Sequence, residues 1–317
     1  MSPIDANEAN ASSTDLFETY RPLMFSIAYR MLGSATDAED IVQEAFLRCQ
    51  GVDYESIRAP KAFFGTVVTR LSLNQLTSAR AKRERYIGPW IPEPVMTEDG
   101  DAVVLSTVLP SPSQQAELHD SVSLAFLMLL ERLSPVERSV FLLREVFGYD
   151  YAEIAHILEQ EETNCRQLLG RAKKHLADQR PRFRAPPAQH RRLLSQFIET
   201  VSAGDVTGLI ELLNEDVRMW ADGGGKTRGA ALHPLDGAKA VASFVIASTR
   251  YLPAAARFEL AMVNGQITAL IRDKEQAVLV IAIEAQDNRI SEIRVIGNPD
   301  KLTHLSSSRS NQQVDSK

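Results

Sequence analysis

Two clusters of proline divide this chain into blocks and constrain its fold more than any other feature. Five prolines, at positions 89, 92, 94, 110 and 112, fall between residues 86 and 112, and a second break follows at 181–189. Proline lacks the backbone N–H that helices and central strands require. We therefore expect folded blocks at about 12–85, 115–180 and 189–303, with a linker at 86–114 and a polar, disordered tail at 304–317.

Composition and signals narrow the class of protein. Apolar residues make up 44% of the 317 positions, enough for buried cores, and the longest apolar runs have seven residues, whereas roughly eighteen are needed to cross a bilayer. The N-terminus is polar and carries no secretory signal. Cys49 and Cys165 provide no disulfide framework, and the six histidines show no metal-ligand spacing. We expect a cytoplasmic protein that uses no membrane, metal or cofactor.

Charge is segregated along the chain. The net charge is −6, yet residues 162–192 hold nine Lys/Arg against two acids, a local charge of +7, so the other 286 residues carry −13. A basic segment within an acidic chain is the electrostatic pattern of a localised anion-binding surface.

The block at 12–85 has the spacing of helices. Apolar residues recur at helical intervals over 17–31, and the sequence 34–37 resembles a capping box that begins a second helix. Three polar residues of this second helix, at i, i+3 and i+4, lie apart from its apolar stripe: Asp40, Gln43 and Glu44. Considered on its own, this patch is a solvated helix face.

A third helix is expected from Lys61 to about Arg85. Phe63 and Phe64 have the spacing of core residues, and the helix ends in a basic run that includes Lys82 and Arg83.

The block at 115–180 indicates a helix-turn-helix. Capping boxes at 134–137 and 150–153 each begin a short helix, and a basic helix then runs over about 162–178. Its exposed residues are Asn164, Arg166, Gln167, Arg171 and Lys174. Amide and guanidinium groups have the geometry that reads purine edges in a major groove. A solvated basic face is the alternative, and the paired caps favour DNA binding.

The third block is predicted to be a compact α+β domain. Helical spacing persists to Leu213, and strand-like runs follow at 217–221, 258–263, 267–272, 277–284 and 290–296, which we expect to pair antiparallel. The sequence GGGKT at 223–227 lacks the earlier glycine of a phosphate loop, so we interpret it as a turn that approaches another surface closely. Asp222 and His233 are candidates for an acid/base pair, although a structural role is the favoured interpretation.

Together these residues resemble a known family. The sequence GSATDAEDIVQEAFLR at 33–48 resembles region 2 of bacterial extracytoplasmic-function (ECF) sigma factors, and RAPKAFFGTVVTRLSLNQLTSARAKRE is similar to their promoter-melting segment. LSPVERSVFLLREVFGYDYAEIAHIL, followed by NCRQLLGRAKKHL, resembles region 4. YIGPWIPEP, DGGGK and NPDKL resemble the subgroup with a fused SnoaL-like domain. The implied fold is two all-α sigma domains plus a C-terminal α+β domain like nuclear transport factor 2.

The resemblance implies a role for each matched position. Core RNA polymerase would be bound by Asp40, Gln43 and Glu44. Promoter DNA would be contacted at the −10 element by Phe63, Phe64, Arg70, Asn74, Lys82, Arg83 and Arg85, and at the −35 element by Asn164, Arg166, Gln167, Arg171 and Lys174. Regulatory contacts would involve Trp90, Pro92 and Pro94 of the linker with Asp222, Gly223, Gly224, Gly225 and Lys226 and with Asn298, Pro299, Asp300, Lys301 and Leu302.

The chain departs from the family at the region 4 turn. Glu159, Gln160 and Glu161 stand where a glycine, a variable residue and a serine are usual, and these acids are expected to weaken or redirect −35 contact. The leading hypothesis is an alternative sigma factor, not an enzyme, regulated by its C-terminal domain, whose cavity is a candidate site for a small molecule. The alternatives are a SnoaL-like cyclase or isomerase and a DNA-binding regulator that works without polymerase.

Overall fold

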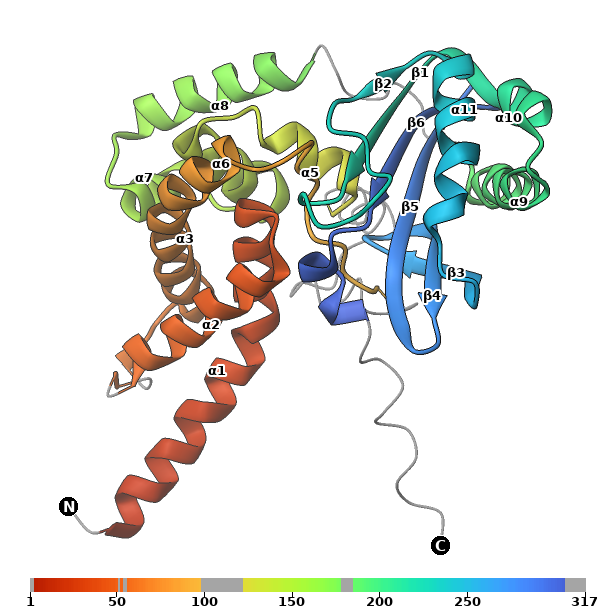
Figure 1. The fold of residues 1–317 in the computed structure, drawn as a ribbon. Helices are drawn as coiled ribbons and strands as arrows, with labels where there is room; N and C mark the ends of the chain where they lie inside the picture. The colour runs from red at the N-terminus through yellow and green to blue at the C-terminus, as the bar shows by residue number, and fades with distance from the viewer. Residues whose placement is uncertain (1–2, 51, 54–55, 98–121, 178–184, 306–317) are drawn as a thin grey trace, which may run out of the picture. The chain divides into compact units, whose positions relative to one another are not determined.

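The computed structural model describes residues 3–50, 52, 53, 56–97, 122–177 and 185–305, with backbone alone for 3–15, 77–82 and 84 (Figure 1). The chain forms two compact units. The first combines Met1–Lys82 with Asp99–Arg180, and the second combines Arg83–Glu98 with Pro181–Lys317. The N-terminal part of the proline-rich linker therefore belongs with the C-terminal domain. No helix in the described ranges is long and apolar enough to cross a membrane.

The first unit begins with three helices, α1 (Pro3–Leu32), α2 (Ala35–Cys49) and α3 (Pro60–Glu84). Gly33 ends α1 with a φ of 66°, a left-handed conformation that glycine adopts without strain. The predicted cap of α2 is present, because the Ser34 side chain accepts a hydrogen bond from the Asp37 N–H at 3.0 Å. Phe17 packs edge-on against Phe46 and Phe64, which joins the three helices.

The remaining helices of this unit are α5 (Leu124–Leu130), α6 (Pro135–Phe141), a π-helical turn η2 (Leu142–Val146), α7 (Tyr151–Leu158) and α8 (Glu162–Ala177). Both predicted capping boxes form, at Ser134 with Glu137 and at Asp150 with Glu153. These boxes satisfy N–H groups that a helix start otherwise leaves without partners.

Buried side chains join the two helical sets. Arg138 is 3% exposed and donates to the carbonyl oxygens of Leu130 and, at 2.5 Å, Met31 at the end of α1. The Tyr149 hydroxyl donates to the Lys61 carbonyl at 3.0 Å, directly against Gly65, where a Cβ would collide with the phenol. Within this unit the α1–α3 and α5–α8 sets therefore pack as one body.

The second unit contains a sheet covered by helices. The helices are α9 (Pro187–Ala203), α10 (Val206–Leu212) and α11 (Ala238–Ser248), with 3-10 turns η3 (Thr249–Tyr251), η4 (Pro299–Lys301) and η5 (Thr303–Leu305). The strands are β1 (Leu213–Asp222), β2 (Leu235–Asp236), β3 (Ala256–Val263), β4 (Gln266–Asp273), β5 (Gln276–Gln286) and β6 (Arg289–Ile296). Helices α9, α10 and α11 lie together on one side of the sheet (Figure 1).

The sheet has the strand order β2-β1-β6-β5-β4-β3. Asn264-Gly265 and Asp287-Asn288 form two of its tight turns with positive φ at all four residues, as the hairpin prediction requires. Three features differ from the sequence expectation. Strand β1 pairs parallel with β6, because the chain crosses the sheet before returning beside β1. Strand β2 and helix α11 were not anticipated.

Candidate functional site

Helix α8 presents one apolar and one polar face. Its buried side consists of Cys165, Leu168, Leu169, Ala172 and Leu176, and burial raises the pKa of the Cys165 thiol. The exposed side carries Arg166, Gln167, Arg171 and Lys174, with Asn164 half-buried beside them. The predicted DNA-reading residues therefore share one accessible face of a helix whose other face is anchored.

Neighbouring side chains hold Arg166 and Asn164 in place. Arg166 forms an ion pair with Glu162 at 2.7 Å, and its guanidinium carbon lies 4.7 Å from the ring centroid of Tyr151 on α7. The Asn164 amide donates to the Gln160 side chain at 2.7 Å. Both contacts involve exposed partners, so a nucleic acid can replace them at modest cost.

The α3 residues expected at the −10 element separate into two groups. Phe64 is 0% exposed and stacks on Tyr20, while Phe63 is half-buried against Phe64, so these aromatics pack the core as their spacing alone predicts. Asn74 and Arg85 are exposed, and the side chain of Lys82 lies outside the described residues.

Arg70 has a different environment, because it is held by the C-terminal end of α7. Its guanidinium donates to the carbonyl oxygens of Ile157 and His156, each at 2.9 Å, and forms an ion pair with Glu159 at 3.1 Å. Glu159 has a φ of 54°, the left-handed position where the resembled family has glycine. The unusual acid thus forms a contact with a predicted DNA-binding residue inside the same unit.

The polar patch on α2 is accessible to a partner. Asp40 and Gln43 are exposed, and Glu44 accepts a hydrogen bond from Arg48 at 2.8 Å. Sequence reasoning missed Leu47, which is 54% exposed and follows Gln43 by one helical turn. The sequence signal was a leucine that lies outside the apolar stripe of its helix, on the same side as Gln43.

The most connected site of the second unit is where the linker docks on the end of β1. Asp222 is 1% exposed and accepts hydrogen bonds from the Tyr86 hydroxyl at 2.5 Å, the Ile91 N–H at 2.8 Å and the Lys301 ammonium at 2.7 Å. Lys301 also donates to the Ile91 carbonyl at 2.5 Å, and the Asn298 amide donates to the Tyr86 hydroxyl at 2.7 Å. We call these five residues the linker-docking site.

Burial and charge shift two pKa values in the linker-docking site. Burial raises the pKa of the Tyr86 phenol, and its hydrogen bond to Asp222 raises it further. Burial lowers the pKa of Lys301, which the Asp222 charge partly opposes. Each shift reflects a charge taken out of water.

Trp90 extends the linker-docking site by stacking with two cations. The Lys301 ammonium lies 4.2 Å from its ring centroid and the Arg83 guanidinium carbon lies 3.7 Å from it. Each contact of this kind contributes about 0.5–2 kcal/mol. Because Arg83 belongs to the basic run at the end of the predicted melting segment, docking of Trp90 also engages a predicted DNA-binding residue.

The linker then runs along the edge of the sheet. Met96 bridges antiparallel to Val263, and the Thr97 N–H donates to the Met262 carbonyl at 2.9 Å. Asn264 exchanges two hydrogen bonds with Val95, one from its backbone and one to its side chain. The linker thereby covers the C-terminal end of the β3 edge, which is otherwise open to pairing.

The glycines at 223–225 allow the linker to approach the domain. Gly224 has a φ of 56°, and a Cβ there would collide with the Asn298 amide, while a Cβ on Gly225 would press against Ile87. Lys226 forms an ion pair with Asp300 at 2.5 Å. The close approach predicted for this turn is therefore made to the linker.

A largely apolar cavity of about 440 Å³ lies between the sheet and helices α9 and α11. Asp222 is the sole carboxylate of its lining, and it is already bound by the linker. His233 is exposed, and no described residue pairs it with Asp222. The contacts of Asp222 are therefore structural, and they do not include the predicted acid/base partner His233.

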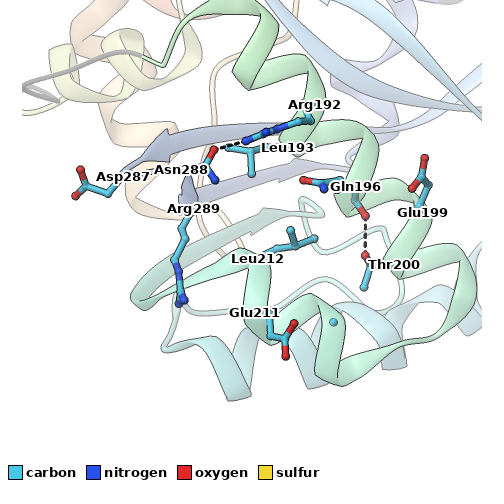
Figure 2. Close-up of a pocket in the computed structure, with 11 residues that line it drawn as sticks. Arg192, Leu193, Gln196, Glu199, Thr200, Glu211, Leu212, Asp287, Asn288 and Arg289 are labelled. Atoms are coloured by element: carbon cyan, nitrogen blue, oxygen red, sulfur yellow. Dashed lines mark hydrogen bonds between the residues drawn. The ribbon is translucent and has the colours of Figure 1, made fainter.

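A second hollow, of about 580 Å³, lies between α9, α10 and the β5–β6 turn (Figure 2). Its lining is polar, with Arg192 bonded to Asn288 and Thr200 to the Gln196 carbonyl at 2.6 Å (Figure 2). It contains neither histidine nor cysteine among its lining residues. Across the described ranges, no group of three or more His, Cys, Asp or Glu residues is arranged to hold a metal ion.

Comparison with known proteins gives matches over both units. Residues 16–82 match sigma-70 region 2, and residues 123–176 match sigma-70 region 4. The ECF RNA polymerase sigma factor SigJ of Mycobacterium tuberculosis is 34% identical over 297 residues, 90% of this chain and 92% of its own length. The probable ECF sigma factor SigI of the same organism is 38% identical over 203 residues, 63% of this chain and 67% of its own length.

The crystal structure of M. tuberculosis SigJ is similar as well. It has 32% sequence identity and a TM-score of 0.69, and it covers 92% of this chain and 98% of its own. The similarity therefore includes the C-terminal α+β domain and is not confined to the two helical regions.

Proposed function

Because this chain belongs to the extracytoplasmic-function sigma factors of RNA polymerase, we propose that exposed side chains on α2, α3 and α8 carry its polymerase and promoter contacts, and that its C-terminal domain regulates them. As an alternative sigma factor, the chain binds core RNA polymerase and promoter DNA and directs the start of transcription.

The observation that carries the promoter proposal is the exposed face of α8. Asn164, Arg166 and Gln167 lie on the first two turns, and Arg171 and Lys174 follow on the same side. A helix of this kind enters the major groove with its N-terminal residues near base edges, while later basic residues meet phosphates. We assign base reading to the first three and phosphate contact to Arg171 and Lys174.

The assignment is tested by comparing Arg166→Ala with Lys174→Ala in promoter binding. Arg166→Ala is expected to cost about 1–3 kcal/mol at one −35 position if the guanidinium pairs with guanine. Lys174→Ala is expected to weaken all sequences alike and to reduce the salt dependence of binding by about one unit of slope. Equal losses on every template from Arg166→Ala would contradict base reading and leave a phosphate contact.

We further infer that the α3–α7 contact represents a resting arrangement. Arg70 is proposed to serve the −10 element, yet its guanidinium is occupied by two carbonyl oxygens and Glu159. Promoter engagement requires these partners to be exchanged for DNA. Asn74, Lys82, Arg83 and Arg85 continue the same proposed −10 surface, while Phe63 and Phe64 support it from the core.

The regulatory proposal rests on the linker-docking site. The linker connects regions 2 and 4, and its first part is bound by buried charges of the C-terminal domain. A tethered partner experiences an effective concentration of about millimolar, so modest contacts suffice to hold it. Docking thus gives the C-terminal domain control over the separation of the two DNA-binding regions, and over Arg83 through Trp90.

A further inference from the structure

The C-terminal domain holds a cavity of about 440 Å³ that is partly open to solvent, with exposed residues such as Arg228 and Tyr251 in its lining. This volume falls in the size range of small-molecule sites. The cavity walls carry four aromatic side chains, Phe197 on α9, Phe244 on α11, Tyr251 on η3 and Phe258 on β3. Such walls suit the apolar body of an organic ligand.

The charged residues of the lining indicate which polar group a ligand of this cavity would carry. Asp222 is paired with Lys301, and Lys226 is paired with Asp300. Arg228, which also lines the cavity, is exposed, and no described residue forms an ion pair with it. A guanidinium remains charged at all physiological pH values and matches a carboxylate with two parallel hydrogen bonds.

We propose that this cavity binds an organic monocarboxylate whose apolar body lies among the aromatic side chains and whose carboxylate meets Arg228. Dispersion contacts and the burial of apolar surface supply the affinity, and the guanidinium selects an anion over a neutral or cationic head group.

The site shares a wall with the linker-docking site, so this inference rests on the proposed regulatory function. Asp222 lines the cavity and also holds the linker, and its carbonyl accepts from the Gly297 and Asn298 N–H groups at 2.8 and 3.0 Å. Thr227 of the lining donates to the Gly297 carbonyl at 2.6 Å. A ligand that moves this wall changes linker docking only by binding the docked and released states with different affinities.

The binding step is tested by calorimetry on the full-length chain without polymerase. The probes are decanoate, decanol and decylammonium, which share one hydrocarbon chain and differ in head group. Decanoate is expected to bind at least tenfold more tightly than decanol, and decylammonium more weakly than both. Equal affinities for the three probes, or no heat from any of them, would overturn the proposal.

Two variants locate the site. Arg228→Gln is expected to reduce decanoate affinity to that of decanol and to leave decanol binding unchanged, whereas Lys239→Gln, an exposed basic control outside the lining, should change neither. Val245→Phe, which fills the cavity from α11, should weaken both probes. Full decanoate affinity in both Arg228→Gln and Val245→Phe would place the fatty acid elsewhere and refute the site.

Coupling to the linker is measured separately. Trp90 and Trp220 are the two tryptophans of the chain, so Trp220→Phe makes Trp90 emission a specific reporter of docking. Decanoate is expected to shift that emission over the same concentration range in which calorimetry detects binding. Binding without any change in Trp90 emission would refute the coupling, while the regulatory proposal itself is judged by linker variants in the absence of ligand.

Discussion

At the scale of single residues, Asp222 and Lys301 explain why the linker docks where it does. Removing two charges from water costs several kcal/mol per ion, and the attraction between them compensates only when further hydrogen bonds complete the site. Here Tyr86 and the Ile91 backbone supply those hydrogen bonds, so the linker completes the coordination of a buried ion pair. Release of the linker leaves this ion pair without those hydrogen bonds, so water has to replace them.

Tyr86 makes linker docking sensitive to alkaline pH. Its pKa is raised by burial and by Asp222, so above its ordinary value of about 10 the docked linker retains a proton that the released linker loses, and docking weakens as pH rises. The lowered pKa of Lys301 has the opposite effect. Between that lowered pKa and about pH 10.5, the Lys301 ammonium is more fully protonated in the released state than in the docked state, so docking strengthens as pH rises.

We therefore expect Trp90 emission in Trp220→Phe to report stable or improving docking up to about pH 10 and release above it. Tyr86→Phe in the same background should weaken docking at neutral pH and remove the alkaline decline. An identical alkaline decline in both proteins would assign the titration to another group.

At the scale of elements, the turn between α7 and α8 in region 4 contacts helix α3 of region 2, because Glu159 forms an ion pair with Arg70. Glu159 ends α7 in a left-handed conformation, which costs a non-glycine residue about 1–3 kcal/mol. Glu159→Asn, which tolerates that conformation, is expected to remove the ion pair with Arg70 and raise −10 promoter affinity severalfold. An exposed ion pair contributes up to about 1 kcal/mol, which sets the upper limit of the effect near fivefold.

Glu159→Asp is the matched control, because it tolerates the same left-handed conformation and retains a negative charge near Arg70. Promoter-melting assays on both variants distinguish the ion pair from general loosening of the turn. Equal activity in the wild type and in Glu159→Asn would show that the Arg70 contact does not restrain initiation.

Helix α2 carries the prediction for polymerase binding. Asp40→Ala combined with Glu44→Ala should reduce affinity for core enzyme, because losing one side of a charge pair buried in a complex costs about 2–5 kcal/mol. Leu47→Ser is expected to add to that loss through its exposed apolar surface. Competition binding measures the change, with circular dichroism to verify folding and Glu18→Ala as the exposed acidic control on α1. Unchanged core affinity would remove this patch from the interface.

Features that depend on residues close together in the sequence could be predicted, and features that depend on distant residues could not. The capping boxes, the turns at Asn264-Gly265 and Asp287-Asn288 and the faces of α8 depend on a few adjacent residues, and these were predicted; the left-handed turn at Lys274 was not. The fold class, two helical sigma regions followed by an α+β domain, is also confirmed. The parallel pairing of β1 with β6 and the Arg70–Glu159 contact depend on residues more than 70 positions apart, which no local pattern encodes.

At the scale of the whole molecule, the linker both connects regions 2 and 4 and binds the C-terminal domain. Through the chain it connects regions 2 and 4, and through Asp222, Asn298 and Lys301 it is bound to the C-terminal domain. In the proposed function, the two regions reach separate promoter elements. The docked linker is the control point of that proposal, and Arg83, stacked on Trp90, links docking to the proposed −10 contacts.

Releasing the linker is accordingly expected to raise transcription. Trp90→Ala removes the platform shared by Arg83 and Lys301, and Asp222→Asn leaves the buried Lys301 without its counter-charge. Both variants should increase run-off transcript severalfold at equal polymerase occupancy, since each lost contact is worth about 0.5–2 kcal/mol or more. Trp220→Phe, which changes the other tryptophan, should match the wild type. If both docking variants give wild-type transcript levels while protease sensitivity in both, and Trp90 emission of Asp222→Asn in the Trp220→Phe background, show the linker released, the C-terminal domain does not act on initiation through the linker.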